Sequence, residues 1–313
     1  MGFLGILVQV TWVAVMLSEL AAAAIEFPIA LPNCPDKCGD VEIPYPFGLR
    51  KGCYIDQNFF VNCTNSSGPT QPIIPGGFTV TNFSLEGQAN VLTYVAKDCY
   101  DEQGVPDSST WNSVYLNVGL NFTISSTQNK FFVVGCDTYA YLNTQQDKGN
   151  FSTGCVSVCE NTWYIVNGSC SGVGCCEVDI PNGLNSVTLE SYSFNNYTKV
   201  GAFNPCGYAF ISQQSRFNFS IDSFQSLKHQ NMMPLVLDWA IGTETCKDVN
   251  KSSYACRGNS ICIDSGNGSG YRCKCKEGYD GNPYLDLGCQ GINLWIYTKF
   301  LKQILKEKKK RSK

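Results

Sequence analysis

The chain has 313 residues, of which 43% are hydrophobic and 16% charged, and its formal net charge is −3. Eighteen cysteines and a single histidine, His229, argue against zinc sites and favour disulfide bonds, which form in an oxidising compartment. This composition excludes an ordinary cytosolic enzyme, and the length suits two domains.

Residues 1–24 predict a secretory signal peptide. They are apolar from Phe3 to Leu17 and end in four alanines, although the basic residues that usually come first are missing. The apolar run is shorter than the ~20 residues that cross a membrane. We therefore expect cleavage near Ala24 and export of the chain.

Ten Asn-x-Ser/Thr sequons support export, because such sites are glycosylated on the surfaces of secreted proteins. We expect a glycosylated surface with short strands and loops between the sugars. The predicted glycosylation sites are Asn62, Asn65, Asn82, Asn121, Asn150, Asn167, Asn196, Asn218, Asn250 and Asn267.

Charge is distributed unevenly along the chain. Residues 34–245 contain 18 acidic and 9 basic residues, which gives −9, and residues 246–289 contain 5 acidic and 6 basic residues, which gives +1. Residues 290–313 contain 8 basic residues and 1 acidic residue, which gives +7. The cysteine-rich body is therefore acidic and the tail is basic.

Residues 34–63 read CPDKCGDVEIPYPFGLRKGCYIDQNFFVNC and include four cysteines. Pro44 and Pro46 bracket Tyr45, and a proline fixes its own φ and favours extended geometry in the residue before it. We expect a stiff, extended segment that carries aromatic rings and is pinned by disulfides on both sides.

Short alternating or β-branched runs dominate the chain before residue 290 and predict strands, whereas helical periodicity is hard to find there. The predicted fold class is β-rich and disulfide-rich, with a cysteine-rich β domain at residues 25–245 and a small module at residues 246–289. The apolar run Met232–Trp239 is expected to be the last strand of the first domain. The other predicted strands are 78–85, 114–118, 121–124, 130–135 and 217–221.

Twelve cysteines lie in the first domain, and the sequence leaves their pairing open. Cys175 and Cys176 are adjacent, and neighbouring cysteines rarely bond each other because the small ring strains the peptide. We expect these two to point to opposite sides of the chain and to bond two different segments.

The last six cysteines form a second unit that is too small to bury a sufficient core without disulfides. The closely spaced Cys273 and Cys275, followed by Glu277-Gly278-Tyr279, resemble an epidermal growth factor-like (EGF-like) repeat. Sequence alone allows fifteen pairings of six cysteines. The resemblance implies the pairs Cys246–Cys262, Cys256–Cys273 and Cys275–Cys289.

Some EGF-like repeats bind calcium through acidic residues before the first cysteine and an Asp or Asn after the third. Here only Glu244 fits the first position, and the loop between Asp264 and Tyr271 is longer than in that pattern. Ca²⁺ needs six to eight oxygen ligands. We therefore predict no cofactor and no metal site, and calcium is kept as the alternative.

Several ordered motifs carry a second resemblance, to the galacturonan-binding extracellular region of plant wall-associated receptor kinases. It covers about residues 34–292. The motifs include Cys34-Pro35, Ile43-Pro44-Tyr45-Pro46-Phe47-Gly48, Gly52-Cys53-Tyr54, Gly135-Cys136-Asp137, Gly174-Cys175-Cys176, Ile180-Pro181-Asn182-Gly183-Leu184, Cys206-Gly207-Tyr208-Ala209-Phe210 and Leu237-Asp238-Trp239-Ala240-Ile241-Gly242.

The family's domain order continues with a second repeat, a membrane span and a cytoplasmic kinase, whereas this chain departs from it after residue 293. No nucleotide-binding loop or kinase catalytic motif follows. We therefore predict a protein that is not an enzyme, located in the cell wall or at the outer face of the plasma membrane. A truncated or alternatively spliced product and an imperfect gene model both fit this ending.

The resemblance implies binding of pectin, specifically de-esterified homogalacturonan, and no nucleic-acid partner. An acidic domain needs a local basic patch or bridging Ca²⁺ to bind this polyanion. Arg50 and Lys51 are the only adjacent basic pair in the first domain, and a guanidinium can hold a uronate carboxylate through two hydrogen bonds. Tyr45, Tyr54 and Trp111 are predicted to offer aromatic faces to the sugar.

Three alternatives stay open. Tyr45 and Phe47 could belong to the core, with Arg50 and Lys51 in a solvated turn. The chain could instead be a protein- or peptide-binding receptor ectodomain that uses the EGF-like module as a spacer. Residues 290–313, finally, are either a basic amphipathic helix on an anionic membrane surface or a solvated tail.

Overall fold

The computed structural model describes residues 27–64, 69–146, 149–266 and 269–291. The expected signal peptide and the tail from residue 292 onward lie outside the described residues. Within these ranges the chain consists of strands, one α-helix, α2 (Ser223–His229), and two 3₁₀ turns, η1 (Gln57–Phe59) and η2 (Gln214–Arg216). The predicted β-rich, disulfide-rich class is confirmed.

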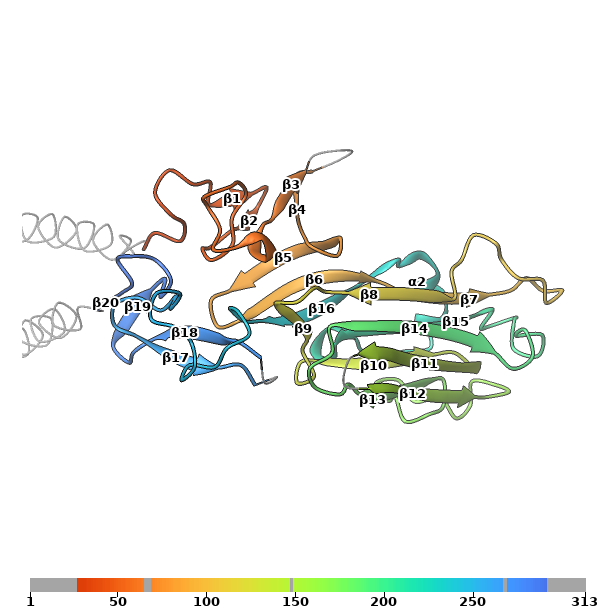
Figure 1. Ribbon diagram of the computed structural model, residues 1–313. Helices are drawn as coiled ribbons and strands as arrows, with labels where there is room; N and C mark the ends of the chain where they lie inside the picture. Colours follow the sequence, from red (N-terminus) through yellow and green to blue (C-terminus); the bar gives the residue numbers. More distant parts are fainter. Residues whose placement is uncertain (1–26, 65–68, 147–148, 267–268, 292–313) are drawn as a thin grey trace, which may run out of the picture.

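Three antiparallel sheets form most of the first domain (Figure 1). The six-stranded sheet has the order β3 (Asn62–Thr64), β4 (Gln71–Ile74), β5 (Phe78–Ser84), β6 (Gln88–Tyr94), β16 (Met232–Trp239) and β9 (Phe122–Ile124). One four-stranded sheet has the order β13 (Cys175–Asp179), β10 (Asn129–Val134), β15 (Cys206–Gln213) and β7 (Ala96–Cys99). The other has the order β12 (Gly149–Val158), β11 (Asp137–Gln146), β14 (Ser186–Ser193) and β8 (Ser113–Asn117).

Side-chain alternation explains how these strands pack. In β8 and β14 every second residue is buried, as expected for a sheet with one face on the core. β10 is instead buried along almost its whole length. Phe131 belongs to one hydrophobic cluster and Phe132 to the other, because β10 lies in a middle layer with packing on both sides.

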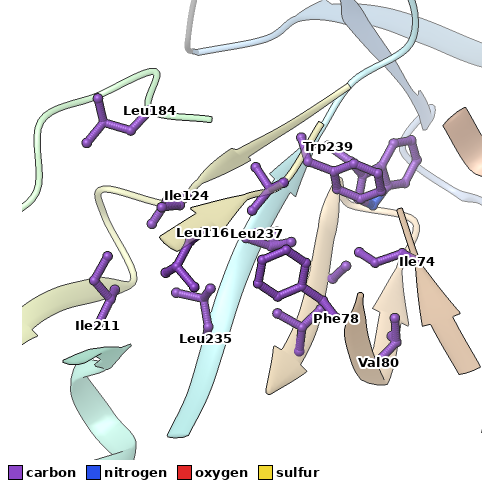
Figure 2. Packing of buried hydrophobic residues seen from close by; sticks show 14 of the residues in the cluster. Ile74, Phe78, Val80, Leu116, Ile124, Leu184, Ile211, Leu235, Leu237 and Trp239 are labelled. Atoms are coloured by element: carbon purple, nitrogen blue, oxygen red, sulfur yellow. The ribbon is translucent and has the colours of Figure 1, made fainter. Parts of the chain in front are cut away.

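The larger hydrophobic cluster joins the three sheets (Figure 2). Leu235 and Leu237 on β16 lie close to Leu116 and Phe78, and Trp239 closes the end nearest the amino-terminal segment. The predicted last strand of the first domain, β16, thus runs through the centre of the core.

The alternating segment at residues 217–221 is not a strand, and this prediction was wrong. It is an irregular connection between η2 and α2. Phe219 is 2% exposed and packs edge-on against Phe224 of α2 at 5.7 Å. The alternation therefore reflects anchoring of a loop under a short helix, and the sequence pattern did not indicate that helix.

Nine disulfides involve all eighteen cysteines. The adjacent Cys175 and Cys176 bond Cys170 and Cys155, as predicted for residues that face different segments. The three EGF-like pairs that the resemblance implied are also present. The other four pairs of the first domain, whose twelve-cysteine pairing the sequence left open, are Cys34–Cys53, Cys38–Cys63, Cys99–Cys206 and Cys136–Cys159.

Three two-stranded sheets complete the described fold. β1 (Lys37–Cys38) pairs with β2 (Val41–Glu42) near the amino terminus, and the EGF-like module contains β17 (Ser260–Asp264) with β18 (Tyr271–Cys275) and β19 (Tyr279–Gly281) with β20 (Cys289–Gly291). This module packs on the first domain: the backbones of Ile241 and Tyr271 exchange hydrogen bonds of 2.9 and 3.1 Å. Figure 1 shows β1 and β2 at the same end as the module.

Candidate ligand-binding site

Arg50 and Lys51 lie in a tight turn directly after the proline-rich segment. The N–H of Cys53 donates to the carbonyl of Arg50 at 3.0 Å, and Gly52 has a φ of +87°. A positive φ at the third position of a hydrogen-bonded turn is readily adopted by glycine, which explains Gly52. The Cys34–Cys53 disulfide fixes the end of the turn, so its two cations are presented from a braced loop.

Both cations of this turn are exposed. The Arg50 guanidinium donates to the carbonyl of Asn33, and neither Arg50 nor Lys51 forms an ion pair with another described residue. A guanidinium has five N–H donors, so one contact leaves several for a ligand. The turn can therefore accept a carboxylate without first breaking a salt bridge to a described residue.

Tyr54 lies next to this turn and is half-buried. Its hydroxyl donates to Oε1 of Gln57 at 2.9 Å, and its ring meets that of Phe60 edge-on at 5.7 Å. These contacts hold the ring in one orientation beside Arg50 and Lys51.

Phe47 is a core residue. It is 1% exposed, and its ring centroid lies 4.1 Å from that of Phe83 and 5.2 Å from that of Trp239. Tyr45 is half-buried at the EGF-like module, and burial raises the pKa of its hydroxyl. Its carbonyl accepts from Nδ2 of Asn282 on that module at 2.7 Å, so Tyr45 lies at the junction between the domains.

Trp111 is placed elsewhere. It is 74% exposed and immediately precedes Asn112, whose carbonyl accepts from Ser191 of β14. The segment between β7 and β8 lies at the far end of the molecule from β1 and β2 (Figure 1). The structure thus brings Arg50, Lys51, Tyr54 and Tyr45 into one region and leaves Trp111 out of it.

Three other cations of the first domain already have partners. Lys97 is 7% exposed, and its ammonium donates to the carbonyl of Lys228 at 2.9 Å and to Oδ1 of Asn231 at 2.8 Å. Lys130 pairs with Asp179, and Lys37 lies 3.6 Å from Glu42. Burial lowers the pKa of Lys97, which agrees with a structural role for that side chain.

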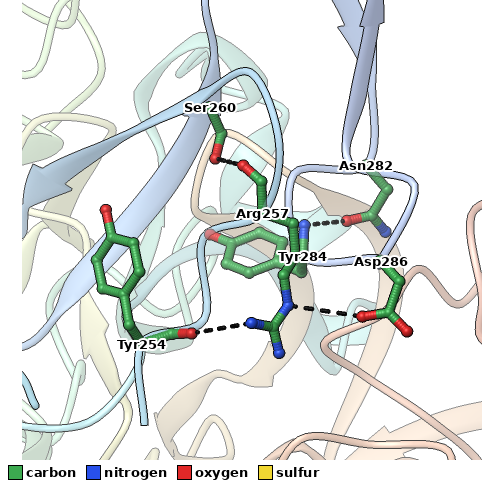
Figure 3. Close-up of polar contacts among 6 residues, drawn as sticks. All are labelled: Tyr254, Arg257, Ser260, Asn282, Tyr284 and Asp286. Carbon is green, nitrogen blue, oxygen red and sulfur yellow. Dashed lines mark hydrogen bonds and ion pairs between the residues drawn. The ribbon is translucent and has the colours of Figure 1, made fainter. Parts of the chain in front are cut away.

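Asn282 of the EGF-like module joins the two domains at the proline-rich segment. Its Nδ2 donates to the carbonyls of Ile29 at 2.9 Å and Tyr45 at 2.7 Å. Its Oδ1 accepts from the N–H of Tyr284 at 3.0 Å, as Figure 3 shows. Asn282 is 2% exposed. Nothing in the sequence around Asn282 indicated these partners, which lie in a distant part of the chain.

Arg257 adds a further cation to this region that sequence reasoning missed. It is exposed, lies 3.7 Å from Asp286 and donates to the carbonyl of Tyr254 at 3.4 Å (Figure 3). An exposed ion pair of this kind contributes little to stability. Arg257 could therefore exchange its partner for a ligand carboxylate.

The residues considered for calcium have other contacts. Oδ1 of Asp264 accepts from the N–H of Cys246 at 2.6 Å, and the hydroxyl of Tyr271 accepts from the N–H of Ala255 at 2.8 Å. Glu244 is exposed. No group of three or more His, Cys, Asp or Glu side chains that could hold a metal ion occurs among the described residues.

Eight of the ten predicted glycosylation sites are described, and Asn65 and Asn267 lie outside the described residues. Asn121 is half-buried, and its Nδ2, the atom to which a sugar would be attached, donates to the carbonyl of Ala240 at 3.0 Å. Glycosylation at Asn121 would have to replace this contact. The exposed sites are Asn62, Asn82, Asn150, Asn167, Asn196, Asn218 and Asn250.

Together, the strand-rich first domain, the nine disulfides and the packed EGF-like module define a disulfide-stabilised extracellular protein. Residues 34–95 match a family described as wall-associated receptor kinase galacturonan-binding, residues 167–248 match the wall-associated kinase family, and residues 246–283 match the EGF-like domain. The predicted site residues Tyr45, Arg50, Lys51 and Tyr54 fall in the first match, and Trp111 falls outside it.

The chain is also similar to individual wall-associated receptor kinases of Arabidopsis thaliana. It is 42% identical to wall-associated receptor kinase 2 over 270 residues, which cover 85% of this chain and 35% of that protein. It is 41% identical to wall-associated receptor kinase 5 over 267 residues, which cover 83% of this chain and 35% of that protein. No solved structure matches the chain.

The chain therefore contains regions that match the galacturonan-binding, wall-associated kinase and EGF-like families, as the sequence motifs predicted. It spans about 35% of the length of the curated relatives it matches. The kinase named in those relatives is a property of those proteins. In the described ranges no helix combines the length and the apolar character that crossing a membrane requires.

Proposed function

We propose that this chain binds de-esterified homogalacturonan through the exposed Arg50–Lys51 turn, with Tyr54 beside it and Tyr45 at the domain junction. The observation that supports this most is the braced turn itself. It presents two adjacent cations that pair with no described carboxylate, within the segment that matches a galacturonan-binding family.

The charge of the surroundings favours a local site. The first domain carries a net charge of −9, so a polyuronate is repelled by most of its surface and attracted only where cations gather. Arg50 can form paired hydrogen bonds to one uronate carboxylate, and Lys51 can neutralise the next as a point charge. Arg257, across the domain junction, provides a third cation for a chain long enough to reach it.

Calorimetric titration of the purified protein with a de-esterified hexagalacturonate tests this proposal. The Arg50→Ala/Lys51→Ala double variant should bind at least tenfold more weakly, which corresponds to about 1.4 kcal/mol. Loss of a charge-assisted hydrogen bond and a nearby ammonium accounts for an effect of that size.

The matched control is Lys199→Ala/Arg216→Ala, which removes one exposed lysine and one exposed arginine elsewhere on the same domain. It should retain wild-type affinity within about twofold, because unspecific attraction to positive charge alone would affect both double variants equally. Titrations with EDTA and with added CaCl₂ separate direct binding from calcium bridging. Equal affinities of wild type and of a folded Arg50→Ala/Lys51→Ala protein would overturn the proposed site.

A further inference from the structure

The sheet β12-β11-β14-β8 packs one face on the core and leaves the other to solvent (Figure 1). Leu142 of β11 and Leu189 of β14 point into the core and are fully buried. The opposite face collects aromatic rings, and we call these residues the tyrosine face. They are Tyr115, Tyr139, Tyr141, Tyr192 and Phe194.

Tyr139 contacts three of the other rings of the tyrosine face. The Tyr139 ring centroid lies 5.4 Å from that of Tyr192, 5.9 Å from that of Tyr141 and 4.6 Å from that of Phe194. Tyr141 and Phe194 remain 43% and 51% exposed. A large contiguous apolar patch on a protein surface commonly marks a site that binds a ligand or a partner.

Gly154 of β12 leaves room for the Tyr141 ring. The two residues are paired across the strands, and a Cβ at Gly154 would meet Cδ1 of Tyr141 at 2.9 Å and Cε1 at 3.4 Å. The ring therefore lies against Gly154, and Tyr141 stays 43% exposed for contact with a ligand.

A hollow of about 520 Å³, lined mainly by polar residues, adjoins these rings. Glu190 and Asn143 lie in it, and Nδ2 of Asn143 donates to Oε2 of Glu190 at 2.6 Å. Oγ of Ser152 donates to Oδ1 of Asn143 at 2.5 Å, and the Tyr192 hydroxyl donates to Oε1 of Glu190 at 3.2 Å. This network fixes amide, hydroxyl and carboxylate groups at the edge of the aromatic patch, as in sites that orient a ligand with a few polar groups.

The charge of this surface is unsuited to pectin. The four strands contain no lysine or arginine, whereas the Glu190 carboxylate lies in the hollow. A polyuronate would be repelled here. A flat, uncharged ligand with hydroxyls and apolar C–H faces matches both the rings and the hollow.

We propose that the tyrosine face binds an extended neutral polysaccharide, a β-1,4-linked hexose chain, at a site separate from the Arg50–Lys51 turn. Pyranose rings with equatorial hydroxyls present C–H groups to aromatic faces, and the Glu190 carboxylate and the Asn143 amide accept and donate hydrogen bonds at the ring edge. Adjacent strands are ~4.8 Å apart, comparable to the length of one pyranose residue, so successive sugars can meet rings from successive strands.

Calorimetric titration with cellohexaose tests this inference. Because Asn150 lies in the hollow and in a sequon, the protein is first treated with an endoglycosidase that trims attached glycans. Wild type should bind cellohexaose, Tyr141→Ala should weaken binding at least tenfold, and Tyr141→Phe should stay within about threefold. Tyr279→Ala is the matched control, since Tyr279 is a 38% exposed tyrosine on the EGF-like module.

A parallel titration with hexagalacturonate separates the two proposals, because Tyr141→Ala should retain wild-type affinity for that anion. No binding of cellohexaose by the folded wild type would overturn the inference, as would equal affinities of wild type and Tyr141→Ala. Sedimentation of the same proteins tests whether a second copy of the chain occupies the tyrosine face instead. A dimer that Tyr141→Ala dissociates, without sugar binding, would assign the tyrosine face to self-association.

Discussion

Phe47 and Arg50 lie three residues apart and have opposite environments. Phe47 packs among Phe59, Phe83 and Trp239 in the core, whereas Arg50 is exposed on a turn. The prolines on either side of Tyr45 and the nearby disulfides restrict the backbone of the segment that contains both residues. One short segment thus serves folding through its buried ring and ligand binding, as proposed, through its exposed cations.

Asp98 of β7 is a buried carboxyl that opposes stability when it ionises. It is 8% exposed, and its Oδ2 has no hydrogen-bond partner among the described residues. Burial raises its pKa to about 6 despite hydrogen bonds from the Ser193 backbone and Tyr100. Because the folded pKa lies above the unfolded value of about 3.9, its stabilising contribution is complete below pH 4 and is lost as the pH rises through 6.

Asp98→Asn should therefore stabilise the protein at pH 7, by roughly 2 kcal/mol, and should have little effect at pH 4. Asparagine keeps an acceptor for the Ser193 N–H and the Tyr100 hydroxyl and removes the buried charge. Thermal unfolding at pH 4, 5, 6 and 7 checks this. Asp101→Asn, at an exposed carboxylate, controls for the loss of one negative charge. If the melting temperature of Asp98→Asn depended on pH in the same way as that of the wild type, the result would contradict this account.

At the scale of elements, the EGF-like module and the proline-rich segment form one unit. Asn282 bonds two backbone carbonyls of the first domain, Ile241 pairs with Tyr271, and the Trp239 and Tyr284 rings lie 5.8 Å apart. The module therefore supports the segment from which the Arg50–Lys51 turn projects.

Asn282→Ala should loosen this junction. Two buried carbonyls would lose their donor, which typically costs about 1–3 kcal/mol per unsatisfied group. Thermal unfolding should shift downward, and limited proteolysis should cut near residues 242–245 faster. The exposed substitution Lys276→Ala on the same module is the control. If Asn282→Ala and Lys276→Ala gave the same melting and cleavage rates, Asn282 would have no role in docking.

Strands in which buried and exposed residues alternate clearly were predictable from the sequence. The alternation at residues 78–85 and 114–118 gave β5 and β8, because a strand with one buried face alternates by necessity. The segment 217–221 shows the same pattern for another reason, a loop anchored by Phe219, so it misled. The helix α2 has only seven residues, too few for a helical period to stand out.

The candidate site was predictable only as far as it is local. Arg50, Lys51 and Tyr54 are neighbours in sequence, and one turn keeps them together. Trp111 was grouped with them by residue type alone, and the sheet order that separates it depends on pairings between distant strands. The contacts of Asn282 and the tyrosine face likewise depend on long-range pairing, although Tyr139 and Tyr141 already stand at strand spacing in the sequence.

At the scale of the whole molecule, two surfaces of different chemistry are available. The Arg50–Lys51 turn presents cations, and the outer face of the sheet β12-β11-β14-β8 presents aromatic rings and the Glu190 carboxylate. Exposed sequons lie on other loops and strands, with Asn150 at the edge of the tyrosine face. A cell wall contains charged and neutral polymers side by side, and these surfaces would allow the chain to contact both.

Hydrogen–deuterium exchange with and without saturating hexagalacturonate tests the central claim most directly. The account predicts slowed exchange of backbone amides at residues 49–56, which form the Arg50–Lys51 turn and its continuation to Tyr54, and no change in β11 and β14. The Arg50→Ala/Lys51→Ala protein should show no such protection at the same ligand concentration. Saturating binding that leaves residues 49–56 unprotected and protects another surface would contradict the assignment of polyuronate binding to this turn.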